Sequence, residues 1–273
     1  MQRTVAGCLA TLMLAGVALA DESIVWSKDW AEAEKQAASS GKPIMIDFFT
    51  DWCGWCKRLD KDTYTHADVV KISREFVNLK TDAEREGKDL AKKYGVSGFP
   101  TIVFLNKSGE QIGRIVGYLP PGPFSKRMTQ IHASEALLPQ LEAKLKENPG
   151  DGEANAQLAE ILATRQKRDE AEAAVAAAEK AGYSGEPLAR AYNELGDSYA
   201  NEQKNDKAVE LFRKADAMSK DTDTRAYAKV SIVVCASALG QKDAAKAAAQ
   251  ELIDLPGAPE DMVIYAKRVL GAE

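Results

Sequence analysis

The sequence contains few residues that could bind a transition metal, with four cysteines and two histidines among 273 residues. A tetrahedral zinc site needs four ligands, which usually come in two close pairs. Cys53 and Cys56 form a close pair, but no second pair follows, and His66 and His132 lie far apart. This distribution argues against zinc. We therefore expect no metal, and nothing in the sequence indicates another cofactor.

After its first twenty residues the sequence also lacks an apolar run of the roughly 20 residues needed to span a bilayer. Residues 1–20 have the layout of a secretory signal peptide, with Arg3 at the start, a short apolar middle, and Ala18 and Ala20 before the cleavage point. An uncleaved anchor is the alternative, but the apolar run is short for a span. We expect an exported protein, periplasmic or otherwise secreted, that is soluble once the signal is removed.

Neither sign of charge is in strong excess, because 36 basic residues face 41 acidic ones and the formal net charge is −5. A mildly acidic chain has no general electrostatic attraction for nucleic acid or for an anionic membrane. We therefore expect protein partners and no nucleic acid.

The close cysteine pair lies in the stretch IDFFTDWCGWCKRLD, residues 46–60. Two thiols at this spacing could be half of a zinc site, a structural staple or a redox catalyst. Zinc lacks its other ligands, and a disulfide that closes so short a loop removes little chain entropy from the unfolded state. In an exported chain with few other cysteines, the pair favours exchange reactions with the thiols of other proteins.

The N-terminal half alternates the patterns of strands and helices. The run PIMIDFFT (43–50) is apolar almost throughout, as in a strand buried on both faces. Ser27 is the expected N-cap of the first helix, and Gly41 lies just past its end. The expected elements are strands at 23–26, 43–50, 76–82 and two within 100–118, and helices at 27–41, 53–60, 66–76, 87–95 and 121–131.

This order of elements and three local motifs resemble the thioredoxin superfamily over residues 23–132. The motifs are IDFFTDWCGWCK at the strand and cysteine turn, GVSGFPT at the following turn, and GRIVGY in the last strand. The nearest resemblance is to exported thioredoxin-like domains that pass reducing power to periplasmic proteins. It implies an α/β thioredoxin-like domain over residues 21–132.

The resemblance assigns roles to three residues near the pair. Cys53 lies where a strand ends and a helix begins, so backbone N–H groups and the helix dipole should stabilise its thiolate and lower its pKa. Cys53 would attack a substrate disulfide, and Cys56 would resolve the mixed disulfide. Asp47 matches a buried carboxyl group that serves the resolving cysteine in thioredoxins, and burial would raise its pKa toward that of a general base. The alternative is that Asp47 faces solvent.

The resemblance also predicts the substrate-binding face. The Phe99–Pro100 bond should be cis and place the backbone of Phe99 beside the cysteines, where an extended substrate could pair with it. Trp52 would form an apolar surface beside Cys53, and Gly54 is the first of the two residues between the cysteines. Trp55 differs from thioredoxin itself, which has proline there. We expect these five residues, Trp52, Gly54, Trp55, Phe99 and Pro100, to contact substrate.

The C-terminal half, residues 133–273, is rich in alanine and charge and has no strand pattern. Units starting near residues 152, 189 and 226 repeat small and large residues at a spacing of 37. The middle unit is similar to the tetratricopeptide repeat, which predicts stacked helical hairpins. An ordinary alanine-rich helical bundle is the alternative.

The leading hypothesis is an exported thiol-disulfide oxidoreductase whose helical repeats recruit a client or a redox partner. Neither residue between the cysteines is cationic, which favours a reductant or isomerase over a strong oxidant. The second hypothesis is a tetratricopeptide adaptor in which the thioredoxin-like unit mainly docks partners. The pair together with Asp47 and Pro100 favours the enzyme, because a docking module would not need all of them.

Overall fold

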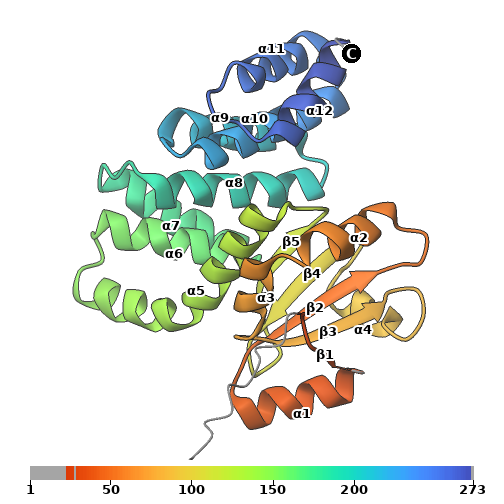
Figure 1. Ribbon diagram of the computed structural model, residues 1–273. Helices are drawn as coiled ribbons and strands as arrows, with labels where there is room; N and C mark the ends of the chain where they lie inside the picture. Colours follow the sequence, from red (N-terminus) through yellow and green to blue (C-terminus); the bar gives the residue numbers. More distant parts are fainter. Residues whose placement is uncertain (1–22, 28, 272–273) are drawn as a thin grey trace, which may run out of the picture.

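The computed structural model describes residues 23–27 and 29–271, so the predicted signal peptide lies outside the described residues. Figure 1 shows an α/β half, coloured red to yellow, and a stack of helices, coloured green to blue. Within the described residues, no helix is both long enough and apolar enough to cross a bilayer. Both expected fold classes, α/β followed by all-α, are confirmed.

The α/β half is built on a five-stranded sheet with the strand order β1-β3-β2-β4-β5. Strands β1, β3 and β2 run parallel, while β4 is antiparallel to β2, and β5 is antiparallel to β4. The strands are β1 (Trp26–Ser27), β2 (Ile44–Phe49), β3 (Val77–Asp82), β4 (Thr101–Leu105) and β5 (Gln111–Val116). The central strand β2 therefore has a neighbour on each side, as its apolar sequence predicts.

Helices cover both faces of this sheet. One face packs on α1 (Trp30–Ser40) and α4 (Lys88–Lys93), and the other on α3 (Ala67–Ser73) and α5 (Pro121–Glu147). Side chains alternate along β2, so that Ile46 packs toward α1 while Met45 packs toward α5. Asp47 is two residues from Met45 and therefore shares the second face.

The structure differs from the sequence prediction at the ends of two elements. The N-cap of α1 is Asp29, whose carboxylate accepts a hydrogen bond from the Glu32 N–H at 2.8 Å, so the assignment to Ser27 is wrong. Ser27 belongs to β1 instead. The helix after the cysteine pair consists of α2 (Gly54–Arg58) followed directly by a π-helix, η1 (Leu59–Thr63).

The two halves share one helix. The sequence predicts a helix ending near residue 131, but α5 runs without a break to Glu147 and contains Pro139. Its first part packs Phe124 and Met128 under the sheet, and its later part packs Leu141 against α6 (Gly152–Thr164). The residue at which we divided the halves, 132, therefore lies inside α5.

The C-terminal half contains three helical hairpins where the repeats predict them, followed by one more helix. The helices are α6 (Gly152–Thr164), α7 (Arg168–Lys180), α8 (Glu186–Asn201), α9 (Asn205–Met218), α10 (Thr222–Ala238), α11 (Lys242–Ile253) and α12 (Glu260–Leu270). The alanines at the twentieth repeat position, Ala171, Ala208 and Ala245, are all buried. Small residues at this position allow the helices of the stack to approach closely.

Gly196 in α8 shows how close this approach is, because a Cβ at this position would lie 2.6 Å from the ring of Phe212 in α9. We predict that Gly196→Val lowers the free energy of unfolding by about 1–3 kcal/mol, through overpacking of the α8–α9 contact. Chemical denaturation measures this change. The matched control is Gly150→Val, at an exposed position where the nearest heavy atom is 3.7 Å from the added Cβ. Equal stability of both variants would contradict the packing argument.

Candidate active site

The cysteine pair lies at the beginning of α2, at the carboxyl end of β2. Cys53 is the N-cap of this helix, and its Sγ accepts a hydrogen bond from the backbone N–H of Cys56 at 3.0 Å. A disulfide joins the two cysteines. They are 4% and 3% exposed, so both cysteines are almost completely buried in this disulfide form. After reduction, the same N–H group is placed to stabilise a Cys53 thiolate.

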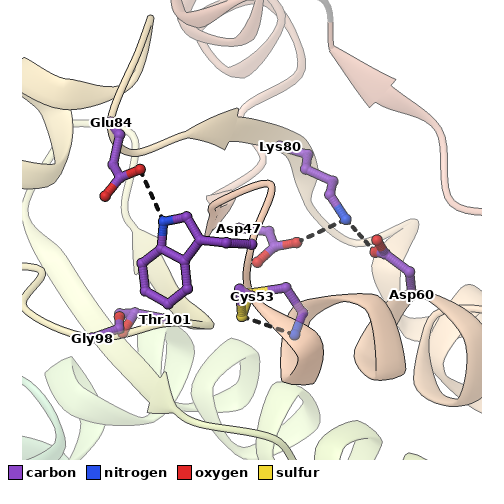
Figure 2. The surroundings of a disulfide bond; sticks show 9 residues. Asp47, Cys53, Asp60, Lys80, Glu84, Gly98 and Thr101 are labelled. Carbon is purple, nitrogen blue, oxygen red and sulfur yellow. Dashed lines mark hydrogen bonds and ion pairs between the residues drawn. A yellow bond between two sulfur atoms is a disulfide. The ribbon is translucent and has the colours of Figure 1, made fainter.

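Asp47 occupies the middle of β2 and is completely buried, so the alternative in which it faces solvent is wrong. Burial raises the pKa of this carboxyl group to about 6, although the nearby Lys80 ammonium acts to lower it. The Lys80 Nζ lies 3.3 Å from Asp47 Oδ2. Figure 2 shows the Asp47 carboxyl group turned toward Lys80 in the neighbourhood of the disulfide. At neutral pH such a group can both accept and release a proton.

Lys80 connects this buried acid to the surface. It lies opposite Asp47 in the register of the parallel β2–β3 pair, and its amine also binds the exposed Asp60 in η1 (Figure 2). The rings of Phe49 and Tyr64 lie 5.1 and 5.5 Å from the Lys80 Nζ and confine it from the side. The buried carboxylate therefore has a cationic neighbour that is itself shared with a solvent-exposed carboxylate.

No sequence motif predicted a role for Lys80 or Asp60. Lys57, which follows the cysteine pair directly, is exposed on α2. A signal for Lys80 does exist: it is a charged residue within VNLKTD, a strand that the thioredoxin-like order places beside the strand of Asp47. The parallel pairing of these strands would have been needed to find the contact.

The expected substrate-binding residues surround the disulfide. Trp52 and Trp55 are 68% and 56% exposed, and Gly54 between them is also exposed. The Trp52 indole N–H donates to Glu84 Oε2 at 3.0 Å, and its ring packs edge-on to Phe99 (Figure 2 shows the bond to Glu84). These contacts hold a large apolar side chain in place at the surface beside the disulfide.

The second tryptophan is fixed by a different set of contacts. The Trp55 ring packs against Tyr118 with 5.7 Å between ring centroids, and the Arg58 guanidinium lies 4.6 Å from the Tyr118 ring. Trp55, at the position that is proline in thioredoxin itself, is therefore an exposed aromatic side chain held in place by Tyr118.

The predicted cis bond between Phe99 and Pro100 is confirmed. The turn is held by a hydrogen bond from Thr101 Oγ1 to the Gly98 carbonyl at 2.8 Å and by one from the Gly117 N–H to the Pro100 carbonyl at 2.8 Å. Phe99, through its contact with Trp52, and the segment after β5 therefore both border the disulfide region.

The contacts of Lys80 predict opposite effects of two substitutions on Asp47. Lys80→Met should raise the pKa of Asp47 above about 6, because it removes the nearby positive charge, and Asp60→Asn should lower it, because it removes a negative one. The carboxyl carbon shift of Asp47, followed by NMR in the disulfide form, measures both. Lys57→Met is the control and should leave this titration unchanged. Shifts of the same sign for Lys80→Met and Asp60→Asn would contradict the network.

Comparison with known proteins agrees with this geometry. The family model for thioredoxin-like domains matches residues 30–132, and that for the tetratricopeptide repeat matches residues 189–222. The thioredoxin-like protein HCF164 of Oryza sativa subsp. japonica is 33% identical over 105 residues, which is 38% of this chain and 40% of that protein. The thiol:disulfide interchange protein DsbD of Actinobacillus pleuropneumoniae is 35% identical over 103 residues, 36% of this chain and 18% of that protein.

Among solved structures, a thioredoxin from Thermus thermophilus is 30% identical and covers 41% of this chain and 89% of its own, with a TM-score of 0.38. The chain matches less than half the length of the two curated relatives. Residues 30–132 are a thioredoxin-like domain, and the helices that follow include a tetratricopeptide repeat at residues 189–222.

Proposed function

We propose that this chain is an exported thiol-disulfide oxidoreductase that reduces or isomerises disulfides in proteins of the cell envelope. The observation that carries the proposal is the Cys53–Cys56 disulfide at the start of α2, following a strand that contains the completely buried Asp47. A structural staple needs no buried acid, whereas disulfide exchange needs a group that takes the proton of the resolving thiol.

The reaction starts from the reduced pair. The Cys53 thiolate attacks one sulfur of the substrate disulfide, forming a mixed disulfide and releasing one substrate sulfur as a thiolate, which takes a proton from water. Asp47 takes the proton of Cys56, and the Cys56 sulfur attacks Cys53, which releases the second substrate sulfur as a thiolate that takes the proton from Asp47. Two electrons have passed to the substrate, and the pair is left as the disulfide seen in the structure. A dithiol donor protein must return two electrons for the next cycle.

The surface around the disulfide fits a protein substrate. Trp52, Gly54 and Trp55 present an exposed, largely apolar surface, and the turn at Phe99 and Pro100 lies against Trp52. We assign substrate contact to these five residues. The names of the relatives, a thioredoxin-like protein and a thiol:disulfide interchange protein, support the same chemistry.

The other parts of the chain extend this proposal. Residues 1–20 would be a signal peptide that directs export, residues 21–132 the redox domain, and residues 133–273 the helical repeats that recruit a client or the redox partner. The uncharged residues between the cysteines favour a reductant or isomerase over an oxidant.

A trapping experiment tests the proposal. The Cys56→Ala variant lacks the resolving thiol, so mixed disulfides between Cys53 and envelope proteins should accumulate and be visible on non-reducing gels. The variant with Ala at both positions is the matched control and should trap nothing. Purified wild type should also catalyse reduction of insulin by a dithiol. If the single variant traps no protein and the wild type has no such activity, the oxidoreductase proposal is wrong, and the adaptor hypothesis replaces it.

A further inference from the structure

A cleft of about 600 Å³ lies between the sheet and the helical repeats. One wall is formed by β5 and the beginning of α5, and the other by α8 and the first residues of α10 and α12. The first wall combines the apolar side chains of Ile115, Val116 and Leu119 with the basic side chains of Arg114, Lys126 and Arg127, whereas the second carries mostly polar side chains. The cleft is a composite of both halves of the chain, so neither half has it alone.

The apolar side chains of the first wall continue directly to the redox site. Val116 is more than half exposed, and the next residue, Gly117, donates its N–H to the carbonyl of Pro100 in the turn whose Phe99 packs on Trp52. Tyr118 then packs against Trp55. A protein segment whose disulfide lies over Cys53 could therefore continue along this wall into the cleft.

Three of the four basic side chains that line the cleft are in ion pairs: Lys126 with Asp221 and Asp223, Arg127 with Glu194 at 2.7 Å, and Arg190 with Glu160 at 2.6 Å. The fourth, Arg114, donates to the Tyr94 and Gly95 carbonyls. An acidic ligand would have to compete with a carboxylate for each of the first three.

Two acceptors on α8 can each take a further hydrogen bond. Asn193 is 6% exposed, and its Nδ2 donates to the Thr224 carbonyl at 3.1 Å, but its buried Oδ1 has no hydrogen-bond partner. Asp197, one turn further along α8, accepts a bond from the Tyr227 hydroxyl at 2.7 Å, and no cation of the described residues lies within ion-pair distance of it. A buried acceptor without a partner is unfavourable, and a ligand that donates a hydrogen bond to it removes that cost.

We propose that this cleft binds an extended segment of the disulfide substrate and recognises a basic side chain in it. The N–H groups of an arginine donate to Asn193 Oδ1 and to the Asp197 carboxylate, and apolar neighbours in the segment pack on Val116 and Leu119. Arginine fits better than lysine, because its planar group carries five donors that can reach two acceptors at once. This inference rests on the proposed function and names its substrate class: protein disulfides with an arginine near the cysteine in sequence.

Synthetic peptides test the inference. Each is about ten residues of Gly, Ser and Ala with one cysteine linked to glutathione and one arginine, whose distance from the cysteine varies across the set; in a matched set glutamine replaces the arginine. For at least one spacing, the wild type should reduce the arginine peptide with a kcat/KM about tenfold higher than the glutamine peptide, the gain expected for a charge-assisted pair. Asp197→Asn should reduce this ratio to near unity.

The controls separate recognition from chemistry. Asp206→Asn, an exposed carboxylate on α9, should keep the preference, and all variants should reduce a small aromatic disulfide at the wild-type rate. Asp197→Ser replaces Asp197→Asn if the latter does not fold, as judged by thermal unfolding. Equal kcat/KM for both peptide sets at every spacing, or a preference that survives at Asp197→Asn, overturns the inference.

Failure of the proposed function would look different, because the wild type would then reduce no disulfide, including the small one. In that case calorimetry with the same peptides decides about the cleft. Binding of an arginine peptide about tenfold tighter than its glutamine partner, lost in Asp197→Asn, supports the cleft as an arginine site. Equal binding of the two peptides overturns it.

Discussion

A completely buried carboxyl group in the central strand of a β-sheet is the constraint on which this site depends. Burial disfavours the ionised form of Asp47 and raises its pKa to about 6. The Lys80 ammonium, 3.3 Å away, acts in the opposite direction and favours the ionised carboxylate. The sheet imposes this contact, because β2 and β3 pair in parallel with the two residues in register. Residues 50–52 connect the end of β2 to Cys53, so only a short turn separates the strand of the acid from the helix of the thiol pair.

Helix α5 gives the rest of the molecule its relation to this site. It packs Met128 under the sheet and Leu141 against the repeats, and Arg127, next to Met128, pairs with Glu194 of α8. One continuous helix with apolar contacts at both ends is a stiff connection. It holds the polar face of α8 opposite the apolar side chains of β5. The surface of the repeats is therefore fixed in position relative to the redox site.

Most of the redox site could be predicted from the sequence, because its parts are local motifs. The cysteine pair follows a buried strand, Gly41 ends a helix, and the Phe99–Pro100 turn has its own signature. Prediction failed where a property depends on distant contacts. Lys80 became visible only with the strand register, and the N-cap at Asp29 depended on where β1 ends. The cleft joins residues from β5 and α8, which no motif connects.

The central claim is that Asp47 removes the proton from Cys56 when the mixed disulfide is resolved. Stopped-flow reaction of the reduced protein with an aromatic disulfide separates two thiol releases: attack by Cys53, then resolution by Cys56. In the wild type, the rate of resolution should depend on a group with a pKa of about 6. Asp47→Asn should lose this dependence and slow resolution about 100-fold or more. The same substitution should have little effect on the first release. Equal rates and pH profiles of resolution in both proteins would contradict it.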